Sequence, residues 1–451
     1  MQDMKKGFPG RWLAALHRWR LVALVAVMAM VPAWAGLPLE QWKTANGAKV
    51  MFVGASAIPM VDISVEFDAG SRLDPAGKSG LAALTNTMLD KGIMAVKGKK
   101  GMEEPQIMDA FADAGAIQSG KVGMDRSGYR LRVLSGQESS DGAVQLMIRF
   151  LAHPAFPADV LKREKAIMTA SIKEELTRPQ NIGSRAFTRM VYGNHPYGQS
   201  PTEASVASIS RQDLLDFHRT YYVADRAVIG IVGDLSRKQA EAMAEDISAQ
   251  LPVSTRPMPV MPEEPAQTGG RQMLPHPASQ AHVFKGMAAV KRGDPDFFAM
   301  TVGNYILGGG GFSSRLMNEV REKRGLTYGV SSSFQTMVQP GPYIIGLSTE
   351  KSQVNDALAV VDRTLKDFLD KGPTAAEMEA AKSHLTSSFV MNMEGNRKIL
   401  ELITMVGTYN LPMDYLDTWT DKVQAVTADD VRAAFGRKLS VEKMATVIVG
   451  N

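Results

Sequence analysis

Alternation of apolar and polar residues marks four strands along the chain. The alternating segments are residues 61–70, 128–135, 279–290 and 341–350. Two longer segments, 158–177 and 375–393, carry apolar residues at helical spacing instead. Strands of period two that neighbour one another along the chain favour an antiparallel sheet, with the intervening helices on one face. The pattern therefore predicts an α+β fold.

The chain repeats one plan at an offset of 217 residues. SISRQDLLDFHRTYYVADRAVIGIVGD (208–234) and AVTADDVRAAFGRKLSVEKMATVIVGN (425–451) each contain a helix start, a helix, a connection and a final apolar strand. At the same offset, GLAALTNTMLDKG (80–92) falls on FFAMTVGNYILGG (297–309). A shared order of elements at a fixed period indicates duplication, so we predict two homologous domains.

A segment rich in proline and glycine separates the two copies and predicts an extended linker, because proline lacks a backbone donor and disfavours helix. We expect each domain to be a mainly antiparallel sheet with helices on one face, the two together forming one half of a clam shell. The predicted boundaries are 1–35 for a leader, 36–251 for the first domain, 252–275 for the linker and 276–451 for the second domain.

The first 35 residues are typical of a secretory signal peptide. Five basic residues precede the apolar run LVALVAVMAMVPAWA (21–35), and Ala33 and Ala35 form an A-x-A cleavage site before Gly36. The alternative is an uncleaved anchor, but the run is shorter than the ~20 residues that a transmembrane helix needs. We therefore expect a periplasmic mature protein that begins near Gly36 and has no later membrane span.

Outside this leader the chain is electrically balanced. Of 51 basic and 47 acidic residues, the leader holds five basic and one acidic, which leaves 46 of each. A mature chain without net charge lacks the excess of basic residues that is typical of nucleic-acid-binding proteins. The absence of cysteine excludes disulfides, thiolate metal ligands and a cysteine nucleophile, and it suits an oxidising compartment.

The strongest chemical signal is LGGGGFSSRLMNEVREKRGLTYGVSSSF (307–334). Its middle part has helical spacing, and Gly325 suits a helix end before a strand carrying Tyr328. Arg321 stands seven residues before Tyr328, across that helix end. A guanidinium and a phenol at one point of a cleft are donors suited to a substrate carbonyl or to the oxyanion formed on it. The alternative is a solvated charged helix face beside a packed tyrosine.

The four consecutive glycines 308–311 do not form a phosphate loop, because they lack a G-K-[ST] ending and follow a helix rather than a strand. We expect close approach of a peptide backbone at Gly309, Gly310 and Gly311, or else a tight turn. The seven histidines include no pair four residues apart, and no G-x-S-x-G or S-x-x-K motif is present. The sequence therefore does not support a hydrolase that acts by itself.

These segments carry a family resemblance. The chain resembles the pitrilysin and insulysin family of inverzincin peptidases, especially its short bacterial members and the mitochondrial processing peptidase subunits. The likeness spans nearly the whole mature chain and implies two similar α+β domains joined by a linker. Its motifs are DAGSR…ML-x-KG (68–92), NHPYGQSP (194–201), DLLDFHRTYYVADRAVIGIVGD (213–234) and LGGGGFSSRLMNEVREKRGLTYGVSS (307–332).

In this family an H-x-x-E-H helix and a distal glutamate bind zinc, and the glutamate of the helix is the general base. The resemblance places the two histidines at Ala83 and Thr87, the base at Asn86 and the distal ligand at Ser171. None of these residues is a good zinc ligand or a base near neutral pH. We therefore expect no metal in this chain.

The family's second functional pair, an arginine and a tyrosine that contact the substrate carbonyl, falls on Arg321 and Tyr328 unchanged. The resemblance thus implies a non-catalytic subunit that pairs with a zinc-bearing H-x-x-E-H homologue around a peptide substrate. One alternative is a peptide-binding or structural assembly subunit with no hydrolytic output. A zinc peptidase active alone conflicts with the four substitutions, and the choice between heterodimer and homodimer stays open.

Overall fold

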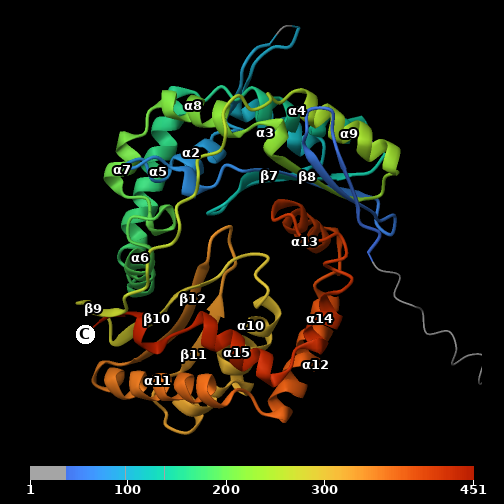
Figure 1. Cartoon of the computed structure of the whole chain (residues 1–451). Coiled ribbons are helices and arrows are strands. Elements are labelled where there is room, and N and C mark those ends of the chain that lie inside the picture. Colours follow the sequence, from blue (N-terminus) through green and yellow to red (C-terminus); the bar gives the residue numbers. More distant parts are fainter. Residues whose placement is uncertain (1–36, 97, 137, 451) are drawn as a thin grey trace, which may run out of the picture. The chain divides into compact units, whose positions relative to one another are not determined.

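Two large sheets organise the chain (Figure 1). The computed structural model describes residues 37–96, 98–136 and 138–450, so the predicted leader lies outside the described residues. Leu39–Asn451 forms one unit. Each sheet carries its own helices, which confirms the predicted α+β fold with two domains. We refer to the elements from β1 to α9 as the first half and to those from β9 to β13 as the second half.

The first sheet has the order β1-β2-β8-β3-β7-β6. β2 and β8 run parallel, and the other neighbours run antiparallel. β3 and β8 are buried along almost their whole length, which places them at the centre of the core. The strands are β1 (Glu40–Lys43), β2 (Lys49–Gly54), β3 (Met60–Phe67), β6 (Ile117–Val122), β7 (Ser127–Leu134) and β8 (Ala227–Gly233).

Helices and one short hairpin complete the first half. The hairpin consists of β4 (Gly92–Ile93) and β5 (Met102–Glu103). The α-helices are α2 (Leu81–Thr87), α3 (Glu104–Asp113), α4 (Glu138–Ala152), α5 (Ala158–Glu175), α6 (Pro179–Tyr192), α7 (Glu203–Ser208), α8 (Arg211–Tyr221) and α9 (Arg237–Ala249). The short 3-10 helices are η1 (Ser71–Leu73), η2 (Pro196–Gly198) and η3 (Ala224–Arg226).

The second sheet has the order β11-β12-β10-β13-β9, with β13 and β9 parallel. Its strands are β9 (Gly270–Leu274), β10 (Gln280–Val290), β11 (Gly329–Phe334), β12 (Gly341–Glu350) and β13 (Ala445–Val449). Its α-helices are α10 (Phe297–Asn304), α11 (Val354–Lys371), α12 (Ala375–Met391), α13 (Asn396–Thr408), α14 (Trp419–Ala425) and α15 (Ala428–Lys438). The remaining helical turns are η4 (Tyr305–Gly309), η5 (Gly311–Ser313), η6 (Met317–Glu322), η7 (Lys351–Gln353) and η8 (Val441–Lys443).

The two halves share one topology, as the repeat predicts. Strands β6, β7, β3, β8 and β2 lie in the same order and directions as β11, β12, β10, β13 and β9. α15 begins 217 positions after α8, and α10 takes the place that α2 has in the first half. β9 lies within the segment 252–275 that is predicted to be the linker. Its side chains are almost all exposed, so no burial pattern marks it in the sequence.

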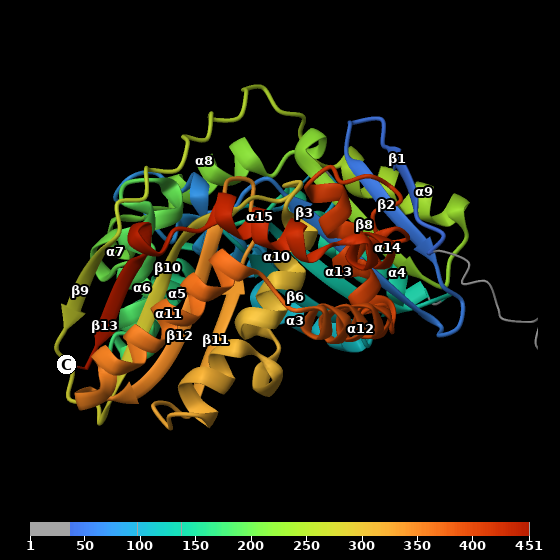
Figure 2. The ribbon, with the colours of Figure 1, turned by 60° about the horizontal axis from the view of Figure 1, so that its bottom comes forward.

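One helix of each half packs on the sheet of the other half (Figure 2). α6 lies against β10 and β13, whereas α13 lies against β8, β3 and β2. Glycines allow the close approach, because a Cβ on Gly183 would lie 2.3 Å from Phe284 and one on Gly230 would lie 2.5 Å from Thr404. Because α6 and α13 each pack on the sheet of the other half, we call this arrangement the helix exchange. It also explains why β3, which α13 covers, is buried on both faces.

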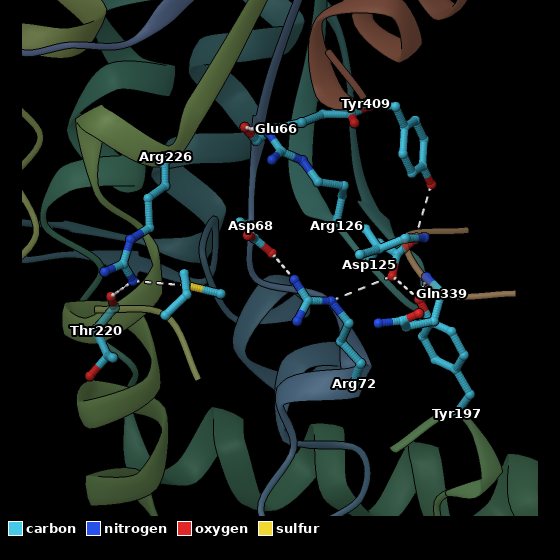
Figure 3. Close-up of polar contacts among 12 residues, drawn as sticks. Glu66, Asp68, Arg72, Asp125, Arg126, Tyr197, Thr220, Arg226, Gln339 and Tyr409 are labelled. Atoms are coloured by element: carbon cyan, nitrogen blue, oxygen red, sulfur yellow. Dashed lines mark hydrogen bonds and ion pairs between the residues drawn. The ribbon is translucent and has the colours of Figure 1, made fainter. Parts of the chain in front are cut away.

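A buried carboxylate ties the halves together (Figure 3). Asp125, which is 4% exposed, lies between β6 and β7. Its Oδ1 accepts from the Tyr197 hydroxyl at 2.5 Å, and its Oδ2 accepts from the backbone N–H of Val338 at 2.9 Å and from the Tyr409 hydroxyl at 3.1 Å. Val338 and Tyr409 belong to the second half, so one side chain fixes two of its segments.

The segment NHPYGQSP (194–201) also contacts both the linker and the second half. The Nε2 of His195 donates to the carbonyl of Pro262 at 3.0 Å, and its Nδ1 accepts from the N–H of Tyr197. The Tyr197 hydroxyl accepts from the N–H of Gln339 at 3.3 Å. These bonds attach the linker and the turn between β11 and β12 to the first half, so the linker does not act as a free hinge.

His218 predicts a specific pH dependence of stability. Burial lowers its pKa to about 4, although the hydrogen bond that Nε2 donates to the carbonyl of Leu151, 2.8 Å long, favours the charged ring. Below pH ~6.5 this histidine is protonated in the unfolded chain but stays neutral in the folded chain. The free energy of unfolding therefore falls as the pH drops toward 4. We expect this residue to account for a loss of roughly 3 kcal/mol over that range.

Urea unfolding between pH 4.5 and 7.5 measures the effect. His218→Gln, which keeps a donor for Leu151 but cannot titrate, should show a flatter dependence than the wild type. His384→Gln, at an exposed position, should keep the wild-type slope. Equal slopes in all three proteins would refute the assignment.

Candidate functional site

α2 packs against the first sheet at β6 and β7. Its amino end is fixed by Asp74, whose carboxylate accepts from the N–H groups of Gly80 and Ala82 at 2.7 and 2.8 Å. Burial raises the pKa of Asp74 to about 6, against the lowering effect of these backbone donors. The flanking Met88 and Leu89 are fully buried, as the sequence predicts for a helix packed on a sheet.

The positions that the resemblance assigns to zinc chemistry have different environments. Asn86 is 3% exposed, and its Nδ2 donates to the carbonyl of Gly128 at 2.9 Å, so the side chain is held by the sheet. Ala83 is half-buried and Thr87 is exposed. Ser171 on α5 is exposed, and its Oγ donates to Glu175 at 3.4 Å. Across the described ranges, no three side chains of His, Cys, Asp or Glu gather as metal ligands would.

Arg321 lies on a π-helical turn of the second half. η6 ends in a turn where the N–H of Gly325, at φ +63°, donates to the carbonyl of Arg321 at 2.8 Å. Leu316 and Val320 are fully buried beneath this turn and anchor it. π-Helical turns often occur at functional sites. Here Arg321 is half-buried, directly after the fully buried Val320.

Tyr328 directly precedes β11, whereas the sequence predicts it within the strand. The reason is Thr327, a buried residue whose Oγ1 accepts from the N–H of Gly329 at 3.1 Å and donates to the carbonyl of Ser348 at 2.5 Å. This side chain occupies the edge of the ladder, so regular pairing starts only at Gly329. Tyr328 points the other way and is 81% exposed.

The structure brings Arg321 and Tyr328 to one pocket, with a volume of about 360 Å³. The Nε of Arg321 lies 3.5 Å from Glu322, and its guanidinium lies over the ring of Phe312 at 4.8 Å from the centroid. Phe312 is itself 69% exposed. Phe312 and Tyr328 are thus exposed, and Arg321 is half-buried. Arginine and tyrosine are among the residue types that dominate binding at protein interfaces.

The glycine run has two structural roles within the chain. A Cβ on Gly308 would lie 2.5 Å from the Ser332 Oγ, so glycine lets η4 approach β11. Gly311, at φ +60°, faces open space and makes the turn before Phe312. Gly309 and Gly311 are exposed and Gly310 is half-buried. The tight turn is therefore present, and a contact of Gly309, Gly310 and Gly311 with a peptide backbone stays a prediction.

An ion pair of Arg315, which lies just before η6, was not predicted from the sequence. Arg315 donates through Nε and Nη2 to the two carboxylate oxygens of Glu377, both at 2.7 Å. Burial would raise the pKa of Glu377, but Arg315 and the capping residue Thr374 lower it to about 2. The capping pattern T-x-x-E at 374–377 was visible in the sequence, but its arginine partner comes from 62 residues away.

Comparisons with known proteins agree with this architecture. A family profile described as Insulinase (Peptidase family M16) matches residues 50–204, and one described as Peptidase M16 inactive domain matches residues 208–385. A crystal structure of a peptidase M16 inactive domain from Pseudomonas fluorescens is 36% identical, with a TM-score of 0.86. The alignment covers 92% of this chain and 98% of that one.

The chain belongs to peptidase family M16. A relative from Bacillus subtilis, named an uncharacterised zinc protease, is 24% identical over 359 residues, which are 79% of this chain and 85% of that protein. A protease from Helicobacter pylori shares the fold at a TM-score of 0.81 and 18% identity, covering 92% of this chain and 99% of that one. Within the described part of this M16 chain, no helix is long and apolar enough to span a bilayer.

Proposed function

We propose that this M16 chain is the zinc-free, non-catalytic subunit of a periplasmic heterodimeric zinc metallopeptidase. Its partner is a homologue with an intact H-x-x-E-H helix, which holds the zinc and the general base. Arg321 and Tyr328 reach into the partner's site, where they bind the scissile carbonyl and donate to the oxyanion as it forms. This chain itself binds peptide but breaks no bond.

The asymmetry between the two sites supports this proposal. Ala83, Asn86, Thr87 and Ser171 offer no zinc ligand, and Asn86 is already engaged by the first sheet. The other pair, a half-buried Arg321 and an exposed Tyr328, lines one pocket. A guanidinium and a phenol stabilise a developing oxyanion but cannot activate water alone, so the chemistry needs a second chain.

The rigid connection between the halves also favours a second chain. Helix exchange and the bonds of Asp125 attach the second half to the first, so closure of a chamber by motion of the linker is not expected. Enclosure of a peptide then falls to the interface with the partner. The predicted leader is the basis for placing this assembly in the periplasm.

Purification of the chain with its bound proteins from the periplasm of its own host tests the proposal. We expect an M16 homologue with H-x-x-E-H to copurify, with zinc near one atom per heterodimer and none in the chain alone. Peptide cleavage should require both subunits. Stoichiometric zinc and cleavage by the chain alone would overturn the proposal, and a complex that binds peptide but never cleaves would favour the assembly role.

A further inference from the structure

The pocket beside Arg321 and Tyr328 extends beyond the pair itself. Its lining also includes residues from the start of β10, the end of β12 and the turn η7, among them Gln280, Ser348, Glu350 and Gln353. A volume of about 360 Å³ lies at the lower end of the range for ligand sites. It has room for one long side chain rather than for a length of peptide.

The charged residues that line the pocket are Arg321, Glu322 and Glu350, so the lining has a net negative charge. Arg321 is balanced by Glu322 at 3.5 Å and is drawn toward Phe312, which does not line the pocket. Glu350 has no ion-pair partner among the residues that the structure describes. The lining therefore carries one carboxylate without a counter-charge, at an exposed position that a ligand can reach.

The neutral groups of the lining suit a cation with several donors. The side-chain amides of Gln280 and Gln353 form no hydrogen bond within the described part of the chain, so their carbonyl oxygens remain available as acceptors. The Oγ of Ser348 is engaged with Nδ1 of His282 at 2.9 Å. One carboxylate and two amide oxygens match the donors of an ammonium or a guanidinium group.

We propose that this pocket binds a lysine or arginine side chain of the peptide, with Glu350 as its counter-charge. The basic residue lies next to the carbonyl held by Arg321 and Tyr328, a placement that rests on the proposed function. Glu350 is thus a residue that determines specificity and takes no part in the chemistry. An acidic side chain at the same place meets an unpaired carboxylate and is rejected.

Fluorescence polarisation with the purified chain tests this inference. The probes are two labelled, end-blocked peptides that differ at one central residue, lysine in one and norleucine in the other. At low salt we expect the wild type to bind the lysine peptide roughly fivefold more tightly, the scale of an exposed ion pair. Glu350→Gln should abolish that preference, and 0.5 M salt should weaken it.

Glu394→Gln, an exposed glutamate that does not line the pocket, is the matched control and should keep the preference. Equal binding of the two peptides by the wild type, no binding of either, or a lysine preference that survives Glu350→Gln overturns the inference. The proposed function is judged separately, by whether the reconstituted complex of the wild-type chain cleaves the norleucine peptide. Cleavage of that peptide without a lysine preference in binding refutes this inference alone, and absence of cleavage refutes the proposed function.

Discussion

Replacing Arg321 with alanine should lower the turnover of the reconstituted heterodimer by about 10²–10³-fold while the complex still assembles. The guanidinium donates to an oxygen that becomes charged only as the tetrahedral intermediate forms. Its loss therefore removes roughly 3–4 kcal/mol of stabilisation from the transition state and little from the bound substrate. The expected signature is a fall in kcat with a nearly unchanged KM.

Arg324→Ala is the matched control for this experiment. Arg324 lies three residues away, and its Nη1 donates to Glu319 at 2.7 Å, outside the pocket. We expect less than a twofold change in kcat for this variant. Tyr328→Phe removes the second donor and should reproduce part of the Arg321→Ala loss. An Arg321→Ala heterodimer that cleaves peptide at the wild-type rate would falsify the catalytic role.

The parts of the fold that local pattern controls were predictable from sequence. Buried alternation identified β3, β7, β10 and β12, and the fixed offset identified the duplication that the sheet orders confirm. β9 was not found, because a strand with exposed side chains has no apolar period to detect. The exchange of α6 and α13 between sheets was also invisible, since periodicity shows that a face is buried but not which surface covers it.

The position of the two candidate residues in one pocket could be predicted from the sequence. The contacts that hold them in place could not. Arg321 and Tyr328 share a pocket, as their spacing across a helix end predicted. The position of Tyr328 outside the strand follows from bonds of the Thr327 hydroxyl, which joins segments about 20 residues apart. Phe312 as a surface for Arg321 and Arg315 as a partner of Glu377 likewise depend on three-dimensional contacts.

Replacing Asp125 with alanine should lower the free energy of unfolding by about 3–5 kcal/mol, the scale of breaking a buried charge network. The carboxylate lies between the Nε of Arg72, 3.4 Å away, and three hydrogen-bond donors from Tyr197, Val338 and Tyr409. Alanine leaves these donors buried without their acceptor. Urea unfolding of the two proteins at pH 7 measures the difference.

If Asp125 joins the two halves, its loss should also have a local effect on the segments that it contacts. The N–H of Val338 donates directly to the carboxylate, so hydrogen exchange in the turn between β11 and β12 should accelerate more than exchange in β3. Asp109→Ala makes the same chemical change at an exposed position of α3 and should change stability by less than ~0.5 kcal/mol. If Asp125→Ala unfolds at the same urea concentration as Asp109→Ala, the halves are held together by their other contacts, which include α6, α13 and the bond between Gln339 and Tyr197. The carboxylate would then have no part in fixing where the second half, with Arg321 and Tyr328, stands relative to the first.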